Sequence, residues 1–232
     1  MFQAFQTIPH LTEISYIDME GFFFSYYIDH DQTLALYSNS SFSSPLDASK
    51  TVFYVQPVNL SNGGLYGNSK IYEHLINASW IWESVNSSNG YSTLGSMWGN
   101  DHEILYVDSV RVSKTGMISL GFAATSIIDI VTPIIIGHKG QSLLLYLASK
   151  KGEVIFQGFQ KVHIDVVFFN DTASFHLVKS NGDQMSYQGS ISCKDNQASA
   201  SVLKIGSTRY LTYCSSIDIM GVESVCFNHS AC

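Results

Sequence analysis

Residues 103–137 read EILYVDSVRVSKTGMISLGFAATSIIDIVTPIIIG, and this stretch predicts how the first half of the chain is built. Apolar and polar residues alternate over Ile104–Val112, which is the period-2 pattern of a half-buried strand. Ser113–Gly116 is a turn signal, because glycine accepts a positive φ without steric clash. Met117–Phe122 then predicts a returning strand, so the pair is expected to form a β-hairpin.

A short helix is expected directly after this hairpin. Thr125 or Ser126 is a candidate N-cap, and Asp129 favours the first turn of a helix. Pro133 or Gly137 would end it. A hairpin followed by a short helix, near the middle of the chain, predicts the end of one sheet domain and the bridge to a second.

The pattern on either side is mostly that of strands. Before the hairpin, the expected strands are Ile14–Asp18, Phe22–Ile28, Thr33–Tyr37, Val52–Val58 and Tyr91–Gly99. After it, strands are expected at Leu143–Leu147, Glu153–Phe156, twice within Val162–Tyr187, at Thr208–Ile219 and through Val225. Helical spacing of apolar residues predicts one helix within Met1–Leu11 and another over Ser69–Trp82. This order favours a sheet with helices packed on it over a sandwich.

Composition limits the possible functions. The chain has 232 residues, enough for one large β domain or two domains of about 100 residues each. Only 13% of residues are charged, the net charge is −7, and no cluster of lysine or arginine occurs. Nucleic acid is therefore an unexpected partner, since phosphate binding requires a clustered basic surface.

The asparagines point to the extracytoplasmic side of a membrane. Chance would give about two N-x-[ST] sequons for twelve asparagines in a chain with this content of Ser and Thr, and six occur. The six predicted glycosylation sites are Asn39, Asn59, Asn77, Asn86, Asn170 and Asn228. An accidental excess on a surface rich in Ser and Asn is the alternative.

All four cysteines lie in the last forty residues, at Cys193, Cys214, Cys226 and Cys232. None forms a C-x-x-C pair, so zinc is not expected. A Cys193–Cys214 disulfide is the favoured interpretation, and closing its loop of about twenty residues is worth roughly 3 kcal/mol in the chain-entropy model. Four cysteines allow three pairings, and whether Cys226 pairs with Cys232 stays open.

Met1 is not followed by a signal-peptide pattern, and no apolar run reaches the roughly 18 residues needed to span a bilayer. A chain with extracellular features but no means of export is expected to be a piece of a longer protein.

Several segments, in this order, resemble the extracellular sensor segment of plant hybrid histidine kinases of the cytokinin-independent type. They are AFQTIPHLTEISYIDMEGFFFSYY (residues 4–27), FYVQPVNLSNGGLYG (53–67), GMISLGFAATSIIDIV (116–131), GSISC (189–193) and TRYLTYCSSIDIMGV (208–222). The resemblance covers the chain up to about Val222, and it rests on the order and spacing of the segments.

This resemblance implies an α+β fold with two PAS-like antiparallel-sheet domains, a double Cache sensor whose long N-terminal helix is truncated here. Residues 1–136 would form the membrane-distal domain and residues 137–232 the membrane-proximal one. The family implies a homodimer, held between two membrane spans that this chain lacks, on the extracellular face of the plasma membrane or in an endomembrane lumen. It senses a signal for a two-component phosphorelay.

The chain departs from the family pattern at both ends. The long helix and first span that should precede residue 1 are absent, and the tail SVCFNHSAC (residues 224–232) is atypical. No phosphoacceptor, ATP-binding or receiver segment is present, so no catalytic activity is expected of this chain.

Family members that bind amino acids hold the carboxylate with a Tyr/Trp/Arg cluster and the ammonium with an Asp. Here Tyr54 and Asp108 lie where such an aromatic and such a carboxylate would fall, but no arginine precedes Arg111. The bidentate carboxylate clamp is therefore missing. A pocket for another small molecule remains a hypothesis, and ordinary core aromatics are the alternative. Its predicted ligand-binding residues are Tyr54, Tyr66, Trp98, Tyr106 and Asp108.

Metal and enzyme hypotheses find little support. Asp29-His30-Asp31 and Asp101-His102-Glu103 are consecutive runs whose side chains would alternate across a strand, and His163 with Asp165 makes only a pair. No nucleophile elbow, P-loop or dinucleotide-binding turn occurs, so no cofactor is expected. The alternatives to a sensor are a secreted glycoprotein binding module, lectin-like or protein-interacting, and a truncated gene product without function.

Overall fold

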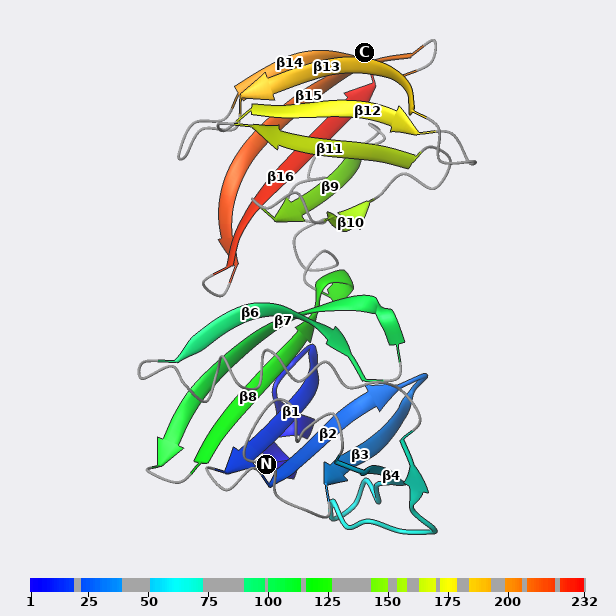
Figure 1. The fold of residues 1–232 in the computed structure, drawn as a ribbon, viewed down its shortest axis with the longest axis vertical. Coiled ribbons are helices and arrows are strands. Elements are labelled where there is room, and N and C mark those ends of the chain that lie inside the picture. Colours follow the sequence, from blue (N-terminus) through cyan, green and yellow to red (C-terminus); the bar gives the residue numbers. More distant parts are fainter. Residues whose placement is uncertain are drawn as a thin grey trace. The chain divides into compact units, whose positions relative to one another are not determined.

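The structure is a computed structural model of residues 1–232. It describes residues 1–18, 22–38, 51–72, 90–98, 100–113, 116–126, 143–149, 154–157, 163–169, 172–178, 184–192, 199–205, 208–219 and 222–231. The chain divides into two compact units, Met1–Ile127 and Ile128–Cys232 (Figure 1).

The described residues of the first unit include the short helix α1, an eight-stranded antiparallel sheet and a helical segment at residues 124–126. The elements are α1 (Phe2–Thr7), β1 (Leu11–Asp18), β2 (Phe23–Asp29), β3 (Gln32–Ser38), β4 (Phe53–Pro57), β5 (Lys70–Ile71), β6 (Tyr91–Met97), β7 (Asn100–Ser113) and β8 (Gly116–Ala123). The strand order is β5-β4-β3-β2-β1-β8-β7-β6 (Figure 1). The first strand of the chain therefore lies beside the last strand of its sheet.

The described residues of the second unit are all in strands. They are β9 (Leu143–Ser149), β10 (Val154–Gln157), β11 (His163–Phe169), β12 (Thr172–Val178), β13 (Gln184–Ser192), β14 (Ser199–Ile205), β15 (Thr208–Ile219) and β16 (Val222–Ala231). Five of them form a sheet in the order β10-β9-β16-β15-β14, and β11-β12-β13 form a separate three-stranded sheet (Figure 1).

The prediction of a mostly antiparallel fold with few helices is confirmed, including the central hairpin of β7 and β8. The helix predicted over Ser69–Trp82 is wrong at Lys70 and Ile71. These two residues form β5 because their backbones pair with Val55 and Tyr54. The rest of that predicted helix, after Tyr72, lies outside the described residues.

Two predictions at chain junctions are refined. Residues 124–126 are helical and follow β8 directly, so this helix begins before the expected cap at Thr125 or Ser126. The tail that departs from the family pattern is part of β16, which pairs with β15 on one side and β9 on the other. The tail is thus an interior strand of the second sheet.

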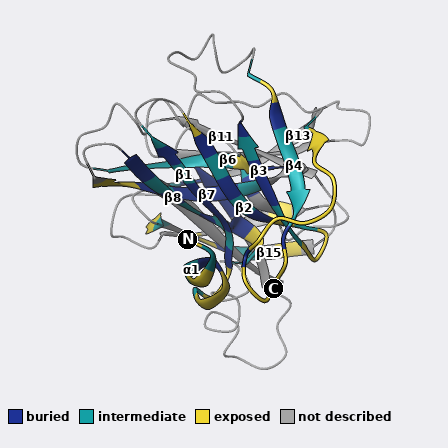
Figure 2. Cartoon of the chain, turned by 90° about the horizontal axis from the view of Figure 1, so that it is seen from below, coloured by how far each residue is buried: buried dark blue, intermediate teal, exposed yellow. Residues whose placement is uncertain are grey.

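Side chains alternate between the two faces of the first sheet. We call the side that carries Ile17, Phe23, Leu36 and Val107 the core face, since these residues form the largest buried cluster of this unit among the described residues. The opposite side is the helix face, where α1 packs (Figure 2). The helix face is partly exposed away from α1, whereas the core face is buried at its centre.

The helix α1 is held by aromatic contacts and ended by a proline. Ring centroids of Phe2 and Phe5 lie 5.3 and 6.1 Å from that of Tyr26 on β2. Ile8 is extended, with φ −80° and ψ 116°, because the ring of Pro9 disfavours a helical residue before it. The predicted helical spacing within Met1–Leu11 is confirmed as far as Thr7.

Candidate functional site

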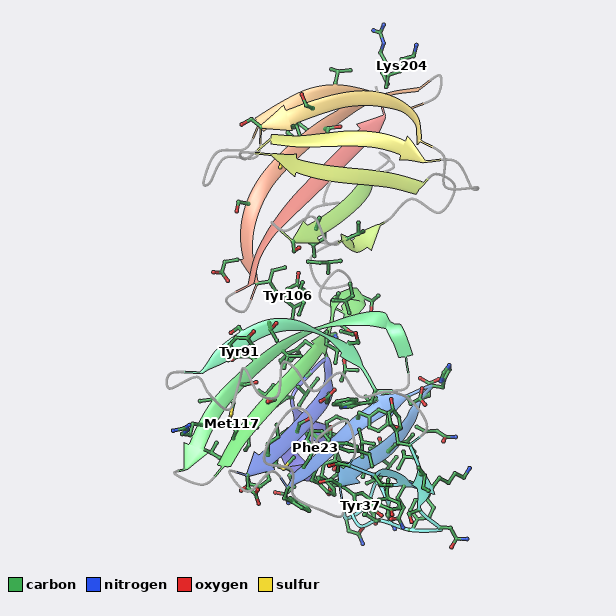
Figure 3. All side chains as sticks on the ribbon, in the orientation of Figure 1. Phe23, Tyr37, Tyr91, Tyr106, Met117 and Lys204 are labelled. Carbon is green, nitrogen blue, oxygen red and sulfur yellow. The ribbon has the colours of Figure 1, made fainter. Side chains whose placement is uncertain are left out.

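The predicted ligand-binding residues lie on both faces of the first sheet and do not form one pocket. Tyr106 is fully buried, and its strand pairing places it on the face opposite Phe23 (Figure 3). Asp108, two residues further along β7, accepts a hydrogen bond from the hydroxyl of Ser92 at 2.8 Å. Trp98 belongs to the core-face cluster.

The remaining two lie near the sheet edge. Tyr54 stacks on Tyr37 across β3 and β4, with ring centroids 5.9 Å apart, and Tyr66 is 57% exposed in the segment after β4. That any of the five contacts a ligand stays a prediction.

Trp98 adjoins a buried carboxyl group that the sequence did not reveal. Glu13 lies on the core face of β1 and is 3% exposed. Its neighbour across the β1–β8 ladder is Gly121, where an added Cβ would lie 3.1 Å from the Cβ of Glu13. The missing side chain at Gly121 leaves the space that the glutamate occupies.

The hydroxyl of Ser15 donates a hydrogen bond to Oε1 of Glu13 at 2.5 Å. The indole of Trp98 and the hydroxyl of Ser25 are further polar neighbours of this carboxyl group. Ser15 and Ser25 are themselves 2.9 Å apart. Burying a polar group is costly unless it is hydrogen-bonded, and the bonds among Glu13, Ser15 and Ser25 offset part of this cost.

The cluster continues as a row of serines across four adjacent strands of the core face. Ser25, Ser15, Ser119 and Ser109 are successive register partners on β2, β1, β8 and β7. All four are at most 2% exposed. The hydroxyls of Ser109 and Ser119 lie 2.7 Å apart. A polar strip therefore crosses the middle of a face that is otherwise aromatic and aliphatic.

The surroundings of Glu13 place its titration near neutral pH. Burial raises the pKa of this carboxyl from 4.5 to about 7, although the neighbouring polar groups of Ser15, Trp98 and Ser25 lower it. Burial also raises the pKa of Tyr27 on the same face, and the negative charges of Tyr72, Asp29 and Glu13 add to this. Glu13 is thus the group of this cluster whose protonation changes near pH 7.

The sequence held a weak signal for this cluster. In β1 the period of two places Glu13, Ser15 and Ile17 on one side. Polar residues in an alternating strand ordinarily mark the solvent side, so they suggest the wrong face here. Only the pairing with β2 and β8 shows that this side is buried.

Among the described residues, no group of three or more metal-binding side chains occurs. Nδ1 of His30 and Oδ1 of Asp29 lie 2.6 Å apart, which is a hydrogen-bond distance. Asp101-His102-Glu103, His163 and Asp165 lie on strands, but their side chains are outside the described set.

Cys214 is fully buried and disulfide-bonded. Cys193 lies outside the described residues, so its pairing with Cys214 stays a prediction.

Asn59 is exposed, and its side-chain oxygen accepts bonds from the amide and hydroxyl of Ser61, at 2.9 and 2.7 Å. Asn228 lies within β16. The other predicted glycosylation sites, Asn39, Asn77, Asn86 and Asn170, are outside the described residues. None of the helices in the described part of the chain is long and apolar enough to cross a membrane.

No protein-family model matches the chain. Among curated proteins, it is 28% identical over 226 residues to histidine kinase CKI1 of Arabidopsis thaliana. The match covers 96% of this chain and 19% of the kinase, so the chain spans about a fifth of that relative. The expected resemblance to plant histidine kinases is confirmed.

Comparison with solved structures gives matches to sensor domains. The extracellular domain assigned to histidine kinase vpHK1S-Z8 is 8% identical with a TM-score of 0.44, over 99% of this chain and 71% of that one. The periplasmic sensory domain of the Campylobacter jejuni chemoreceptor Tlp1 is 9% identical with a TM-score of 0.43, over 98% and 75%.

Proposed function

We propose that this chain is the extracellular sensor, or signal-input, module of a membrane histidine kinase in a two-component phosphorelay. The observation that carries this proposal is the similarity to a histidine kinase along 96% of the chain. Phosphoryl transfer would belong to other domains of such a kinase, and this chain would have no catalytic role.

The two sheets support a double PAS-like arrangement. The five strands β2-β1-β8-β7-β6 of the first unit and the five strands β10-β9-β16-β15-β14 of the second have the same spatial order. If each set of five is numbered along the chain, that order is second, first, fifth, fourth, third. We assign residues 1–136 to a membrane-distal domain and residues 137–232 to a membrane-proximal one. The observed division after Ile127 is slightly earlier than this assigned boundary.

The remaining parts of the proposal follow from the sensor role. The module would face the outside of the plasma membrane or an endomembrane lumen, act as a homodimer and respond to a small molecule. Glycans on the sequons and a Cys193–Cys214 disulfide fit such a compartment. The exposure of Asn59 and the disulfide at Cys214 support these two assignments.

A first experiment is to sequence the full-length transcript that encodes this chain. We expect a membrane span on each side of the module and a kinase region after it. A transcript that encodes a signal peptide and ends after residue 232 would support the secreted alternative instead.

A second experiment tests signalling directly. The chain replaces the matching segment of CKI1, and phosphorylation of that kinase is compared with a version carrying a Gly/Ser linker of the same length. We expect the phosphorylation levels of these two proteins to differ. In a third protein, which carries the chain with Cys214→Ala, we expect the phosphorylation level to change from that of the unchanged chain. Equal phosphorylation in all three proteins would show that the chain transmits nothing.

A further inference from the structure

One face of the hairpin formed by β14 and β15 is exposed in the second unit. Along β15, Thr212 and Cys214 are buried, whereas Tyr213 between them is 42% exposed. Because side chains alternate along a strand, Arg209 and Leu211 lie on the same side as Tyr213, and their register partners on β14 lie beside them. We call this side the hairpin face. Its residues are Ala200, Val202, Lys204, Arg209, Leu211 and Tyr213.

The middle of the hairpin face is apolar. Val202 is 58% exposed, and its register partner Leu211 is half-buried. Tyr213 follows two residues further along β15 and adds an exposed aromatic ring. Single exposed apolar residues are common on protein surfaces, whereas a contiguous group bordered by polar residues marks an interaction site.

Two cations border this apolar group at the end where the strands of the hairpin connect. Lys204 and Arg209 are register partners, and both are exposed. The side chain of Lys204 projects away from the sheet (Figure 3). Like charges directly opposite each other weaken an antiparallel pair, so these two cations oppose the hairpin that carries them.

The chain itself does not neutralise this pair. Among the described residues, neither Lys204 nor Arg209 has an ion-pair partner. Asp218 is the only acidic residue of the two strands, and it lies near the other end of β15. An anionic partner outside the chain would therefore remove the cost of placing the two cations together.

The two units differ in charge. Residues 1–127 contain eleven acidic and four basic residues, so they carry the whole net charge of −7. Residues 128–232 contain eight of each, so the second unit is neutral. An anionic surface repels the first unit and does not repel the second. The Lys204–Arg209 pair thus belongs to the unit that can approach such a surface.

The last strand of the chain ends beside these cations. Ala231 at the end of β16 pairs with Tyr210, the neighbour of Arg209 (Figure 1). In the proposed kinase a membrane span follows this module, so the chain would leave the sheet toward the bilayer from the end that carries Lys204 and Arg209. This step rests on the proposed function.

We propose that the hairpin face docks on the surface of a lipid bilayer that contains anionic lipid. Lys204 and Arg209 bind headgroup phosphates, while Val202 and Tyr213 enter the region between headgroups and acyl chains. Tyrosine suits this region, because its ring is apolar and its hydroxyl still reaches water. A soluble anion would use only the two cations, whereas a bilayer also covers the apolar side chains next to them.

The test holds the full chain on vesicles through a polyhistidine segment after residue 232 and a nickel-chelating lipid. Tethering makes weak docking observable, because it raises the effective concentration of the surface. Tyr213→Trp supplies a reporter, which brominated lipids quench when it enters the bilayer. The three native tryptophans all lie in the first unit, so the chain without this substitution gives the background.

Vesicles of phosphatidylcholine alone are compared with vesicles that also contain phosphatidylglycerol. We expect quenching above background on the anionic vesicles, less on the neutral ones, and a decrease when salt is raised. One basic residue at an anionic surface is worth about a fivefold change in affinity, so Lys204→Ala and Arg209→Ala should each weaken docking by that factor. Quenching that stays at background, or that is equal on both kinds of vesicle, would overturn the proposal.

A matched control separates the hairpin face from the charge of the whole chain. Lys70 is also an exposed lysine on an edge strand, β5 of the first sheet, so Lys70→Ala should leave docking unchanged. Lys204→Ala should keep or raise the melting temperature, because it removes a like-charge contact. Equal docking of these two variants would contradict the assignment of Lys204.

A soluble phosphate distinguishes a membrane surface from a simple anion site. Glycerol 3-phosphate, added at the phosphate concentration of the vesicles, should not displace the chain from them. If it does, the hairpin face binds soluble phosphate and the membrane assignment is wrong. The phosphorylation experiment on the exchanged kinase reads a different property, so either proposal can fail while the other holds.

Discussion

The two units share one strand order but differ in what is inserted into it. In the first unit, β3, β4 and β5 follow the second strand and extend the same sheet at its edge. In the second unit, β11, β12 and β13 occupy the equivalent place in the chain and form a sheet of their own. The five common strands are therefore the frame, and the insertion after the second strand is where the two units diverge.

Their stabilising chemistry differs as well. The first unit has no cysteine, and its core face joins Phe23 to Phe53 and Trp98 through ring contacts of 5.8 and 5.6 Å. The second unit contains all four cysteines of the chain, including the buried, disulfide-bonded Cys214. Each unit therefore offers its own position for a destabilising substitution.

The largest effect is expected from Phe23→Ala. Phe23 is fully buried, and removing a core phenylalanine costs about 4 kcal/mol of unfolding free energy. All three tryptophans lie in the first unit, so urea denaturation followed by tryptophan fluorescence reports on that unit. Phe22→Ala is the control, since Phe22 is 41% exposed.

Hydrogen exchange of β15 and β16 should be unchanged in Phe23→Ala, because these strands belong to the second unit. If their amides lose protection together with those of the first unit, the two units unfold as one, which would contradict the view that each unit is stabilised separately.

A second effect concerns pH in the first unit. The pKa of Glu13 is about 7 in the folded state against 4.5 as the ordinary value. Between these values Glu13 holds more protons in the folded chain than in the unfolded one, so its contribution to stability is greatest below pH 4.5 and falls until about pH 7. The shift corresponds to about 3 kcal/mol.

Glu13→Gln should remove most of this slope, because the amide keeps the shape of the side chain and does not titrate. The measurement is the free energy of unfolding from tryptophan fluorescence between pH 4 and 8. Identical pH dependence in both proteins would mean that Glu13 does not titrate in this range.

The third effect belongs to the second unit. Cys214→Ala should lower its stability by roughly 3 kcal/mol, the value expected for a loop of about twenty residues. Peptide mapping under non-reducing conditions identifies the partner cysteine, which we expect to be Cys193. Hydrogen exchange should show a loss of amide protection in β14–β16 and unchanged protection in β1–β8. A Cys214 pairing with Cys226 or Cys232 would contradict the sequence-based assignment.

Local pattern was sufficient to predict most strands but not the pairing between them. The alternation over Ile104–Val112 and the turn after it identified β7 and β8. Lys70 and Ile71 were assigned to a helix because apolar spacing nearby is helical, whereas pairing with Tyr54 and Val55 makes them an edge strand. Such pairing is set by residues far along the chain.

The same limit explains what was missed at the candidate site. Glu13 and Ser15 are polar residues in an alternating strand, and the sequence does not say which face is covered. Trp98 was expected in a pocket with Tyr106 and Asp108, but it packs into the core-face cluster, while these two residues of β7 lie on the other face. Which face meets the core depends on the tertiary packing.

The smallest effect tests α1, a feature without a counterpart among the described residues of the second unit. Gly63 and Gly67 have φ of 75° and 71°, so alanine is strained at both, by about 1–2 kcal/mol. Only at Gly63 would the new Cβ clash with the ring of Phe2, and nothing lies within 4 Å at Gly67.

Gly63→Ala should therefore displace Phe2 from Tyr26 and lose about 1 kcal/mol more than Gly67→Ala, the typical worth of an aromatic pair. Tryptophan-monitored denaturation of both variants measures this difference, since the shared backbone strain cancels. Because α1 packs on the helix face of the first sheet, hydrogen exchange in β9–β16 is expected to be the same in both variants. Equal losses of stability would show that α1 contributes nothing to the first unit, and the two units would then differ only in their insertions and core chemistry.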